Sequence, residues 1–294
     1  TAPGEVEDSL PRGLQCLGQL GRPDEADGFL EGALTGRKGD ARTAVAAASC
    51  YLYQVMHQGF VVAGEFSRGR QHRRDGRYVD ATDRDRVRAL QLLTQAIDAA
   101  KADPDRARTG AFFQSLAGAL AFGRFPGEAW RLQSLTDLAA LPDYEEGFRG
   151  RWGGDSPGAP VDADGSPVYY RVPESFEKAA NDGERWRWAL AQAAEADAGL
   201  LNTVRMTLGQ FALAQFGTQT LQGGRFEPMD DGDDAEPGTS VYGLETLKDE
   251  ETVARLASGV KRFALPDEFN PIRIFQSVVD DPRTGQAQQA TEAL

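Results

Sequence analysis

The chain has 294 residues, of which 40% are hydrophobic and 26% charged, so it can form one large globular domain or two ordinary ones. Its formal net charge of −13 argues against a nucleic-acid partner, which needs a basic surface, and against adsorption to an anionic membrane. No apolar run approaches the length of a membrane span, so no membrane insertion is expected. No signal-peptide pattern is visible, and the chain is interpreted as a processed protein or a fragment.

The first 140 residues carry the periodicity of amphipathic helices. Ser9 and Asp40 are expected N-caps, and Thr82 with Asp85 resembles a capping box. The alternating charges from Arg84 to Arg88 are interpreted as a solvated face. The expected helices span residues 9–20, 23–35, 40–56, 82–101, 105–121 and 126–139.

Two stretches of this region, residues 20–34 and 122–147, repeat one pattern. In each, an apolar residue, Gly and Arg precede a turn that contains Pro, and an acidic residue with Ala then opens a helix. Such self-similarity predicts helical hairpins that stack, because one hairpin cannot bury its apolar face alone.

Residues 57–79 interrupt the helices, because their glycines exclude one regular helix. The later part, SRGRQHRRDGRY, is the basic patch of an acidic protein. A solvated loop is the default interpretation, and binding of an anion or an acidic partner is the alternative. The candidate partner-binding residues are Arg68, Arg70, Arg73, Arg74 and Arg77.

The remainder of the chain changes character several times. Residues 161–171 predict a β-hairpin around an Asp-Gly turn, and residues 222–239 predict an acidic loop. Further helices are expected at 183–196, 198–216, 249–262 and 268–280. The predicted fold is therefore mainly α: a helical-repeat region (1–140), a Gly/Pro-rich insertion with the β-hairpin (141–182), a second helical region (183–281) and a frayed tail (282–294). The architecture expected is a helical-hairpin, tetratricopeptide-like solenoid with that β-hairpin and loop region inserted.

No motif predicts catalysis or a cofactor. GDSPG at 154–158 matches the G-x-S-x-G pattern, but a strand before Ser156 and a helix after it are missing, and both histidines precede it. Asp162 to Gly165 resembles a calcium loop, yet Pro160 and Arg171 would occupy its first and last ligand positions, so a hairpin turn is expected. Four aspartates could attract Ca²⁺ weakly, but are interpreted as a solvated loop: Asp230, Asp231, Asp233 and Asp234.

The histidines, cysteines and aromatic residues receive structural interpretations. His57 and His72 lack metal-ligand spacing, and His57 is expected to bond carbonyls at a helix end. Cys16 and Cys50 are expected to be buried free thiols, with a disulfide between them as the alternative. An aromatic group is expected to pack the core, with a sugar or peptide groove as the alternative: Trp130, Trp152, Tyr169, Tyr170, Phe176, Trp186 and Trp188.

Two family resemblances can be stated. Leu17-Gly18, Leu20-Gly21-Arg22, Ala26 and Phe29 resemble tetratricopeptide repeats, without a regular repeat period. Several blocks, in order, resemble the N-terminal helical region of large bacterial alpha-2-macroglobulin-like proteins of the planctomycete type. These blocks are HQGFVVAGEFSRG (57–69), RDRVRALQLL (84–93), EAWRLQSLTDLAALPDYEEG (128–147), GAPVDADGSPVYYRVPESFEKAANDGERWRW (158–188) and VKRFALPDEFN (260–270).

The second resemblance implies a segment of a protease-trapping protein of the bacterial cell envelope or periplasm, with the cytoplasm as the alternative location. That family's trap depends on macroglobulin β-domains and often on a Cys-Gly-Glu-Gln thioester, which neither cysteine here matches, so no functional residue is carried over. Two hypotheses follow. The first is a non-catalytic scaffold that docks a protein or a neighbouring domain of the same chain. The alternative is an all-helical carbohydrate-active enzyme, which would need a cleft with two facing carboxylates and a raised pKa on at least one.

Overall fold

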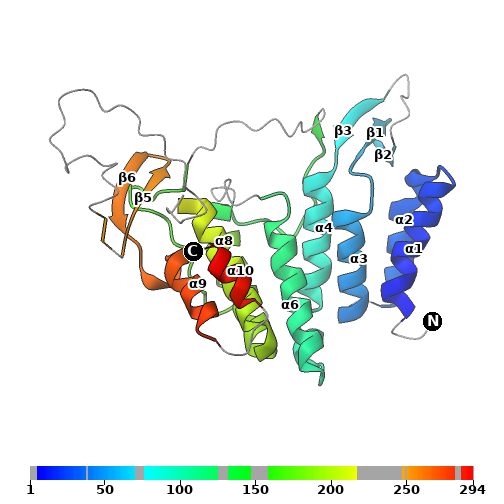
Figure 1. Ribbon diagram of the computed structural model, residues 1–294. Helices are drawn as coiled ribbons and strands as arrows, with labels where there is room; N and C mark the ends of the chain where they lie inside the picture. Colours follow the sequence, from blue (N-terminus) through cyan, green and yellow to red (C-terminus); the bar gives the residue numbers. More distant parts are fainter. Residues whose placement is uncertain are drawn as a thin grey trace. The chain divides into compact units, whose positions relative to one another are not determined.

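The computed structural model describes residues 5–37, 39–69, 76–124, 132–146, 158–216, 247–248, 250–281 and 286–293. The protein is mainly helical, as predicted, and it also contains two small antiparallel sheets among its described residues (Figure 1). It divides into two compact units. The first holds residues 1–123, 135–152 and 173–196, and the second holds 124–134, 153–172 and 197–294. Within the described ranges, no helix has the length and apolar character needed to cross a membrane.

The first unit is built from helices that pack on their neighbours along the chain. In Figure 1, α1, α2, α3, α4 and α6 stand side by side. Leu90, Leu93, Leu116 and Leu120 recur at helical spacing and are fully buried, which places the core between α4 and α6. The helices are α1 (Glu5–Gln19), α2 (Ala26–Leu34), α3 (Ala41–Tyr53), α4 (Thr82–Gln95), α5 (Ile97–Ala102), α6 (Arg106–Ala121) and α7 (Asp182–Ala196), and the 3₁₀-helix η1 (Pro23–Glu25) precedes α2.

A four-stranded antiparallel sheet lies at one end of α3 and α4 (Figure 1). Its order is β2-β1-β3-β4, with Phe60 of β1 opposite Ser67 of β2 and Tyr78 of β3. Ala63 and Gly64 both have positive φ, as a two-residue hairpin turn requires. Of the glycines that exclude a helix here, Gly59 lies in strand β1 and Gly64 in the turn between β1 and β2. The strands are β1 (Gln58–Val62), β2 (Glu65–Arg68), β3 (Arg77–Asp80) and β4 (Glu145–Glu146).

The second unit combines a β-hairpin with helices. Phe216, Leu256 and Phe269 are buried in one cluster, and Phe275 is buried in another with Met206. Gly158 has a φ of +89°, and a Cβ added there would lie 2.6 Å from the backbone of Leu256. The elements are η3 (Ala198–Leu200), α8 (Leu201–Phe216), β5 (Glu251–Leu256), β6 (Gly259–Ala264), η5 (Asp267–Phe269), α9 (Pro271–Val279) and α10 (Ala287–Ala293).

Several predicted elements are confirmed. The helices expected at 105–121 and 183–196 appear as α6 and α7, and Asp40 caps α3 by accepting from the backbone N–H of Arg42 at 3.1 Å. The hairpin turn is also present, because the N–H of Gly165 donates to the carbonyl of Asp162 and Val161 forms an antiparallel bridge with Pro167.

Other predictions about the elements were wrong. The expected helix at 249–262 is the hairpin β5–β6, in which the β-branched residues Thr252 and Val253 are both buried. The expected helix at 126–139 lies partly outside the described residues, and 132–139 forms no α-helix. The tail after 281 contains α10, which buries Ala290 and Ala293 beside Met206. The helix expected at 82–101 divides at Ala96 into α4 and α5.

The helix caps and the cysteines also differ from expectation. α1 begins at Glu5, so Ser9 is an internal residue. Thr82 lies inside α4, and its N–H donates to the carboxylate of Asp80 at 2.7 Å. Both cysteines are free, but Cys16 is exposed and only Cys50 is buried.

Candidate functional site

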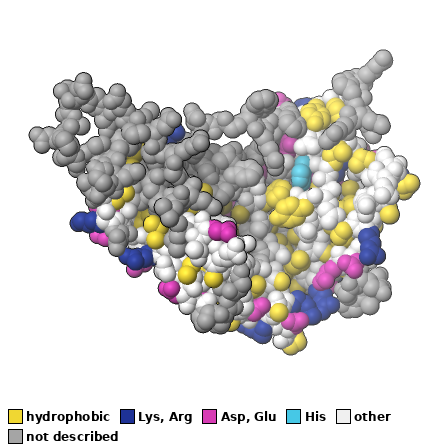
Figure 2. Space-filling model, viewed as in Figure 1, with side chains coloured by type: hydrophobic (Ala, Val, Ile, Leu, Met, Phe, Trp, Pro, Cys, Tyr) yellow, Lys and Arg dark blue, Asp and Glu magenta, His cyan; other side chains and the backbone are white. Residues whose placement is uncertain are grey.

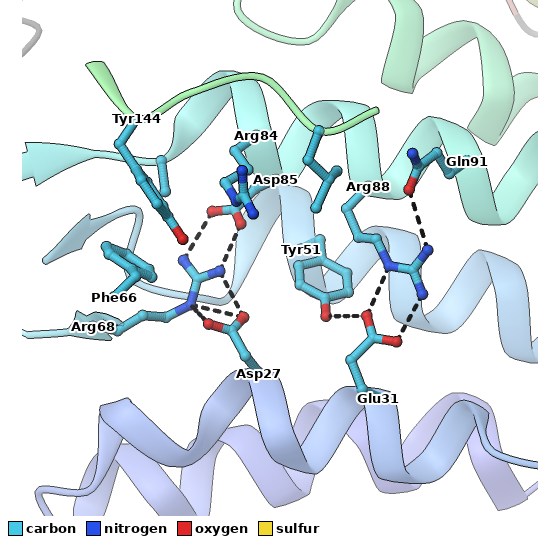
Figure 3. Close-up of a pocket in the computed structure, with 12 residues that line it drawn as sticks. Asp27, Glu31, Tyr51, Phe66, Arg68, Arg84, Asp85, Arg88, Gln91 and Tyr144 are labelled. Atoms are coloured by element: carbon cyan, nitrogen blue, oxygen red, sulfur yellow. Dashed lines mark hydrogen bonds and ion pairs between the residues drawn. The ribbon is translucent and has the colours of Figure 1, made fainter. Parts of the chain in front are cut away.

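The first unit contains a pocket with a volume of about 410 Å³ (Figure 3). It lies between α2, α3, α4, strand β2 and the extended segment that leads to β4. Three arginines and three carboxylates line it together with Tyr51, Phe66 and Tyr144. The charged residues are Asp27 and Glu31 from α2, Arg68 from β2, and Arg84, Asp85 and Arg88 from α4.

Arg68 is the centre of the site. Its Nε and Nη2 donate to Asp27 at 3.0 and 2.7 Å, and its Nη1 and Nη2 donate to Asp85 at 2.9 and 2.6 Å. The second Nη1 hydrogen is used by the carbonyl of Met56 at 2.8 Å. An arginine has five N–H groups, so every donor of this side chain is satisfied. We call this arrangement the Arg68 clamp; it joins α2, β2 and α4.

The Arg68 clamp holds its charges away from water. The side chain of Arg68 is 3% exposed and that of Asp85 is 4% exposed, whereas Asp27 is 40% exposed. Burial alone would lower the pKa of Arg68, but the hydrogen bonds and charges of Asp85 and Asp27 outweigh it and the pKa is raised. The guanidinium is therefore permanently charged, and its two carboxylate partners compensate for its lost hydration.

His57 completes the clamp on the far side of Asp85. Its Nδ1 lies 2.7 Å from Asp85 and its Nε2 lies 3.2 Å from the carbonyl of Leu52 in α3, as expected for a histidine just past a helix end. The imidazole also lies 5.9 Å from the ring of Phe122, which contacts Tyr53 edge-on. Figure 2 shows a histidine at the surface of the described residues, bordered by hydrophobic side chains.

A second ion pair forms the opposite end of the pocket. Arg88 donates from Nε and Nη2 to Glu31, both at 2.7 Å, and the hydroxyl of Tyr51 donates to the same carboxylate at 2.8 Å. Burial would raise the pKa of Glu31, but the bonds from Arg88 and Tyr51 lower it. Burial and the neighbouring Glu31 charge raise the pKa of Tyr51. Glu31 is thus held as a carboxylate and Tyr51 as a neutral phenol.

An aromatic pair and an arginine form the third wall. Phe66 stacks on Tyr144, with ring centroids 4.6 Å apart. The guanidinium of Arg84 lies 4.6 Å from the Tyr144 ring, and its Nη1 donates to the carbonyl of Pro142 at 2.7 Å. Gln91, two turns further along α4, donates to the carbonyl of Leu138 at 3.1 Å. Side chains of α4 therefore hold the extended segment as the roof of the pocket.

A separate ion pair, between Arg86 and Asp182, is buried outside the pocket lining and anchors the start of the extended segment. Arg86 donates to Asp182 of α7 at 2.8 Å and to the hydroxyl of Thr136 at 3.0 Å. The backbone N–H of Thr136 donates to the other oxygen of Asp182 at 3.0 Å, and Asp182 is fully buried. The backbone of this segment is thus bonded to side chains of other helices, which explains why residues 135–139 do not form the expected helix.

The structure separates the candidate partner-binding arginines. Arg68 is buried in its clamp, and Arg77 lies on β3 with its side chain half exposed, 3.0 Å from Glu146. Arg70, Arg73 and Arg74 lie outside the described residues, as do His72, Ser156 and the four aspartates from Asp230 to Asp234. Across the described part of the chain, no group of three His, Cys, Asp or Glu residues could hold a metal ion.

The aromatic residues expected to pack the core do so wherever the structure describes them. Phe176, Trp186 and Trp188 are buried in the first unit, and Tyr170 is buried in the second. Tyr169 packs against Phe216 and Phe269 of the second unit. Packing is therefore confirmed for these residues, which form two separate cores; Trp130 and Trp152 lie outside the described residues.

The sequence reasoning missed the charged residues that build the pocket. The run from Arg84 to Arg88 was expected to be a solvated face, which is wrong for Asp85 and Arg86, since both are buried. A signal for Arg86 was present, because it lies four and seven residues before the core residues Leu90 and Leu93 and thus on the buried stripe of α4.

Comparisons with known proteins assign the chain to no family. No protein-family model matches the chain. No curated protein and no solved structure matches it either.

Proposed function

We propose that this chain is a non-catalytic docking module, whose pocket in the first unit receives a segment of a partner protein or of a neighbouring domain of the same chain. The observation that carries this proposal is the Arg68 clamp. It uses every donor of a buried guanidinium to fix α2, β2 and α4 around an open pocket. Such a rigid, polar concavity suits binding, because little conformational freedom is lost when a partner docks.

The hydrogen bonds of the pocket carboxylates favour binding over acid–base catalysis. A carbohydrate-active enzyme would need two facing carboxylates, one of them with a raised pKa. The pKa of Glu31 is lowered, and Asp27 and Asp85 both accept hydrogen bonds from Arg68. All three carboxylates are thus engaged in hydrogen bonds with arginines, which leaves the enzyme hypothesis without a supporting observation in this pocket.

We also propose that the first unit is a helical-hairpin array of the solenoid type, with the sheet β1–β4 added to it. The packing of α1 on α2, α3 on α4 and α6 on α7 supports this proposal, since repeat arrays are built from such neighbouring pairs. The sequence resemblance extends it to a segment of a larger alpha-2-macroglobulin-like protein of the bacterial cell envelope or periplasm. A cytoplasmic location is the alternative.

A selection of displayed random peptides on the immobilised chain tests the docking function. A shared sequence motif should be enriched on the wild type and lost on Leu141→Trp, which fills the pocket from its roof. The variant Arg70→Glu, Arg73→Glu, Arg74→Glu tests the basic stretch in the same way. Arg106→Gln, an exposed change on α6 away from the pocket, is the control. Failure to enrich any motif, or a motif that all three variants retain, would contradict docking at either place.

A further inference from the structure

Arg84, Asp85, Arg88 and Gln91 of α4 form one wall of the pocket, which we call the α4 wall. This wall carries hydrogen-bond donors that its ion pairs do not use. Arg84 and Arg88 are four residues apart on α4 and therefore lie on one face, one turn apart. Arg88 donates twice to Glu31 and once to Gln91, which leaves two of its five N–H groups for another acceptor. Arg84 donates to the carbonyl of Pro142, and no carboxylate in the described parts of the chain pairs with it.

Each carboxylate of the pocket already accepts hydrogen bonds from an arginine, and Arg84 does not serve any of them. Arg68 lies between Asp27 and Asp85, and His57 contacts Asp85 from the other side. Glu31 accepts from both Arg88 and Tyr51. The lining holds three carboxylates and three guanidiniums, and Arg84 is the guanidinium that takes part in neither ion-pair group.

The size and shape of the pocket suit a small acidic group with an apolar or aromatic body. Its volume of about 410 Å³ falls within the range of small-ligand sites. The stacked Phe66 and Tyr144 rings offer an apolar wall next to Arg84, and Leu141 covers the roof. Figure 3 shows the two ion-pair groups at opposite ends, with Tyr51 between them.

We propose that Arg84 and Arg88 bind a carboxylate in this pocket, and that the carboxylate is the C-terminus of a docked polypeptide. The planar fork of a guanidinium matches the two oxygens of a carboxylate, so two such forks one turn apart can hold a single terminal group. A hydrophobic last side chain would lie against Phe66 and Tyr144. The carboxylate site rests on the geometry alone, whereas its assignment to a polypeptide rests on the proposed docking function.

Isothermal titration calorimetry on the full chain tests both parts. The probes are benzoate and its neutral analogue benzamide, followed by the tetrapeptide Ala-Ala-Ala-Phe with a free and with an amidated C-terminus. Arg84→Gln removes the charge, while its amide can still donate to Pro142. Arg106→Gln is the matched control on α6. Leu141→Trp blocks the space without changing any charge, and circular dichroism verifies that each variant is folded.

We expect benzoate and the acid peptide to bind, and both neutral probes to bind at least about tenfold more weakly, the factor for loss of a charge-assisted hydrogen bond. Arg84→Gln should weaken both acids by a similar factor, and Arg106→Gln should change neither. Equal binding of benzoate and benzamide, or benzoate affinity unchanged by Arg84→Gln, would overturn the carboxylate site. Binding of benzoate without the acid peptide would support the site and contradict polypeptide docking there.

Discussion

Replacing Arg68 by Met should destabilise the first unit by about 3–5 kcal/mol, the cost of removing one partner from a buried ion pair. The cost arises mainly at Asp85, whose side chain is 4% exposed and would keep only His57 as a side-chain hydrogen-bond partner. Asp27 contributes less, because at 40% exposure water can replace much of what Arg68 provides. The Met56 carbonyl also loses its donor.

Urea unfolding followed by far-ultraviolet circular dichroism measures this difference. Arg108→Met is the matched control, because Arg108 also contacts two carboxylates, Asp103 at 3.0 Å and Asp105 at 2.9 Å, but is 40% exposed. The control should cost much less, because water replaces most of what an exposed ion pair provides. The double variant Arg68→Met, Asp85→Leu should recover part of the loss, since it leaves no unpaired buried charge. Equal costs for Arg68→Met and Arg108→Met would refute the reasoning.

Three further outcomes follow from the structure. Burial raises the pKa of the Cys50 thiol to about 11, whereas Cys16 is exposed. Near pH 8 a thiol reagent should therefore label only Cys16 in the native chain and both thiols after unfolding. Rapid labelling of both thiols in the native chain would contradict this. Because the folded pKa of Glu31 is lowered, its stabilisation is present above the unfolded pKa of about 4.3 and is lost as the pH falls through the folded value. Glu31→Gln should therefore lower the melting temperature at neutral pH and converge with wild type in acid, and a gap that widens in acid would exclude this origin. Gly158→Ala should lower the melting temperature more than Gly259→Ala. The new Cβ at position 158 would lie 2.6 Å from the backbone of β5, whereas a Cβ at position 259 would face open space. Equal shifts of the melting temperature would rule out this steric argument.

Helices with a clear apolar period could be predicted from the sequence, and the β5–β6 hairpin could not. Helices α6 and α7 carry Phe113, Leu116, Trp186 and Leu190 at helical spacing and appear where expected. The segment ETVARLASGVKRFA contains Ala, Leu, Arg and Lys, which favour a helix locally. Its β-branched residues and the turn before Gly259 favour a hairpin, and packing against the core of the second unit decides between them.

The pocket could not be predicted because its charges come from distant parts of the chain. Arg68 bonds Asp27 and Asp85, which lie 41 and 17 residues away in sequence. No periodic pattern links such positions, and each residue alone is typical of a solvated surface. The sequence suggests one basic stretch from Arg68 to Arg77, whereas the structure places Arg68 in a buried clamp and leaves the side chain of Arg77 on β3 half exposed.

The most direct test of the carboxylate pocket is a nuclear magnetic resonance titration that observes the arginine Nε–H groups while benzoate is added. The signals of Arg84 and Arg88 should move together with a single affinity. The signal of Arg68 should stay in place and exchange slowly with water, since all of its donors are already bonded. Shifts confined to exposed arginines such as Arg106, or no shift of Arg84, would contradict the proposed binding of a carboxylate by the α4 wall.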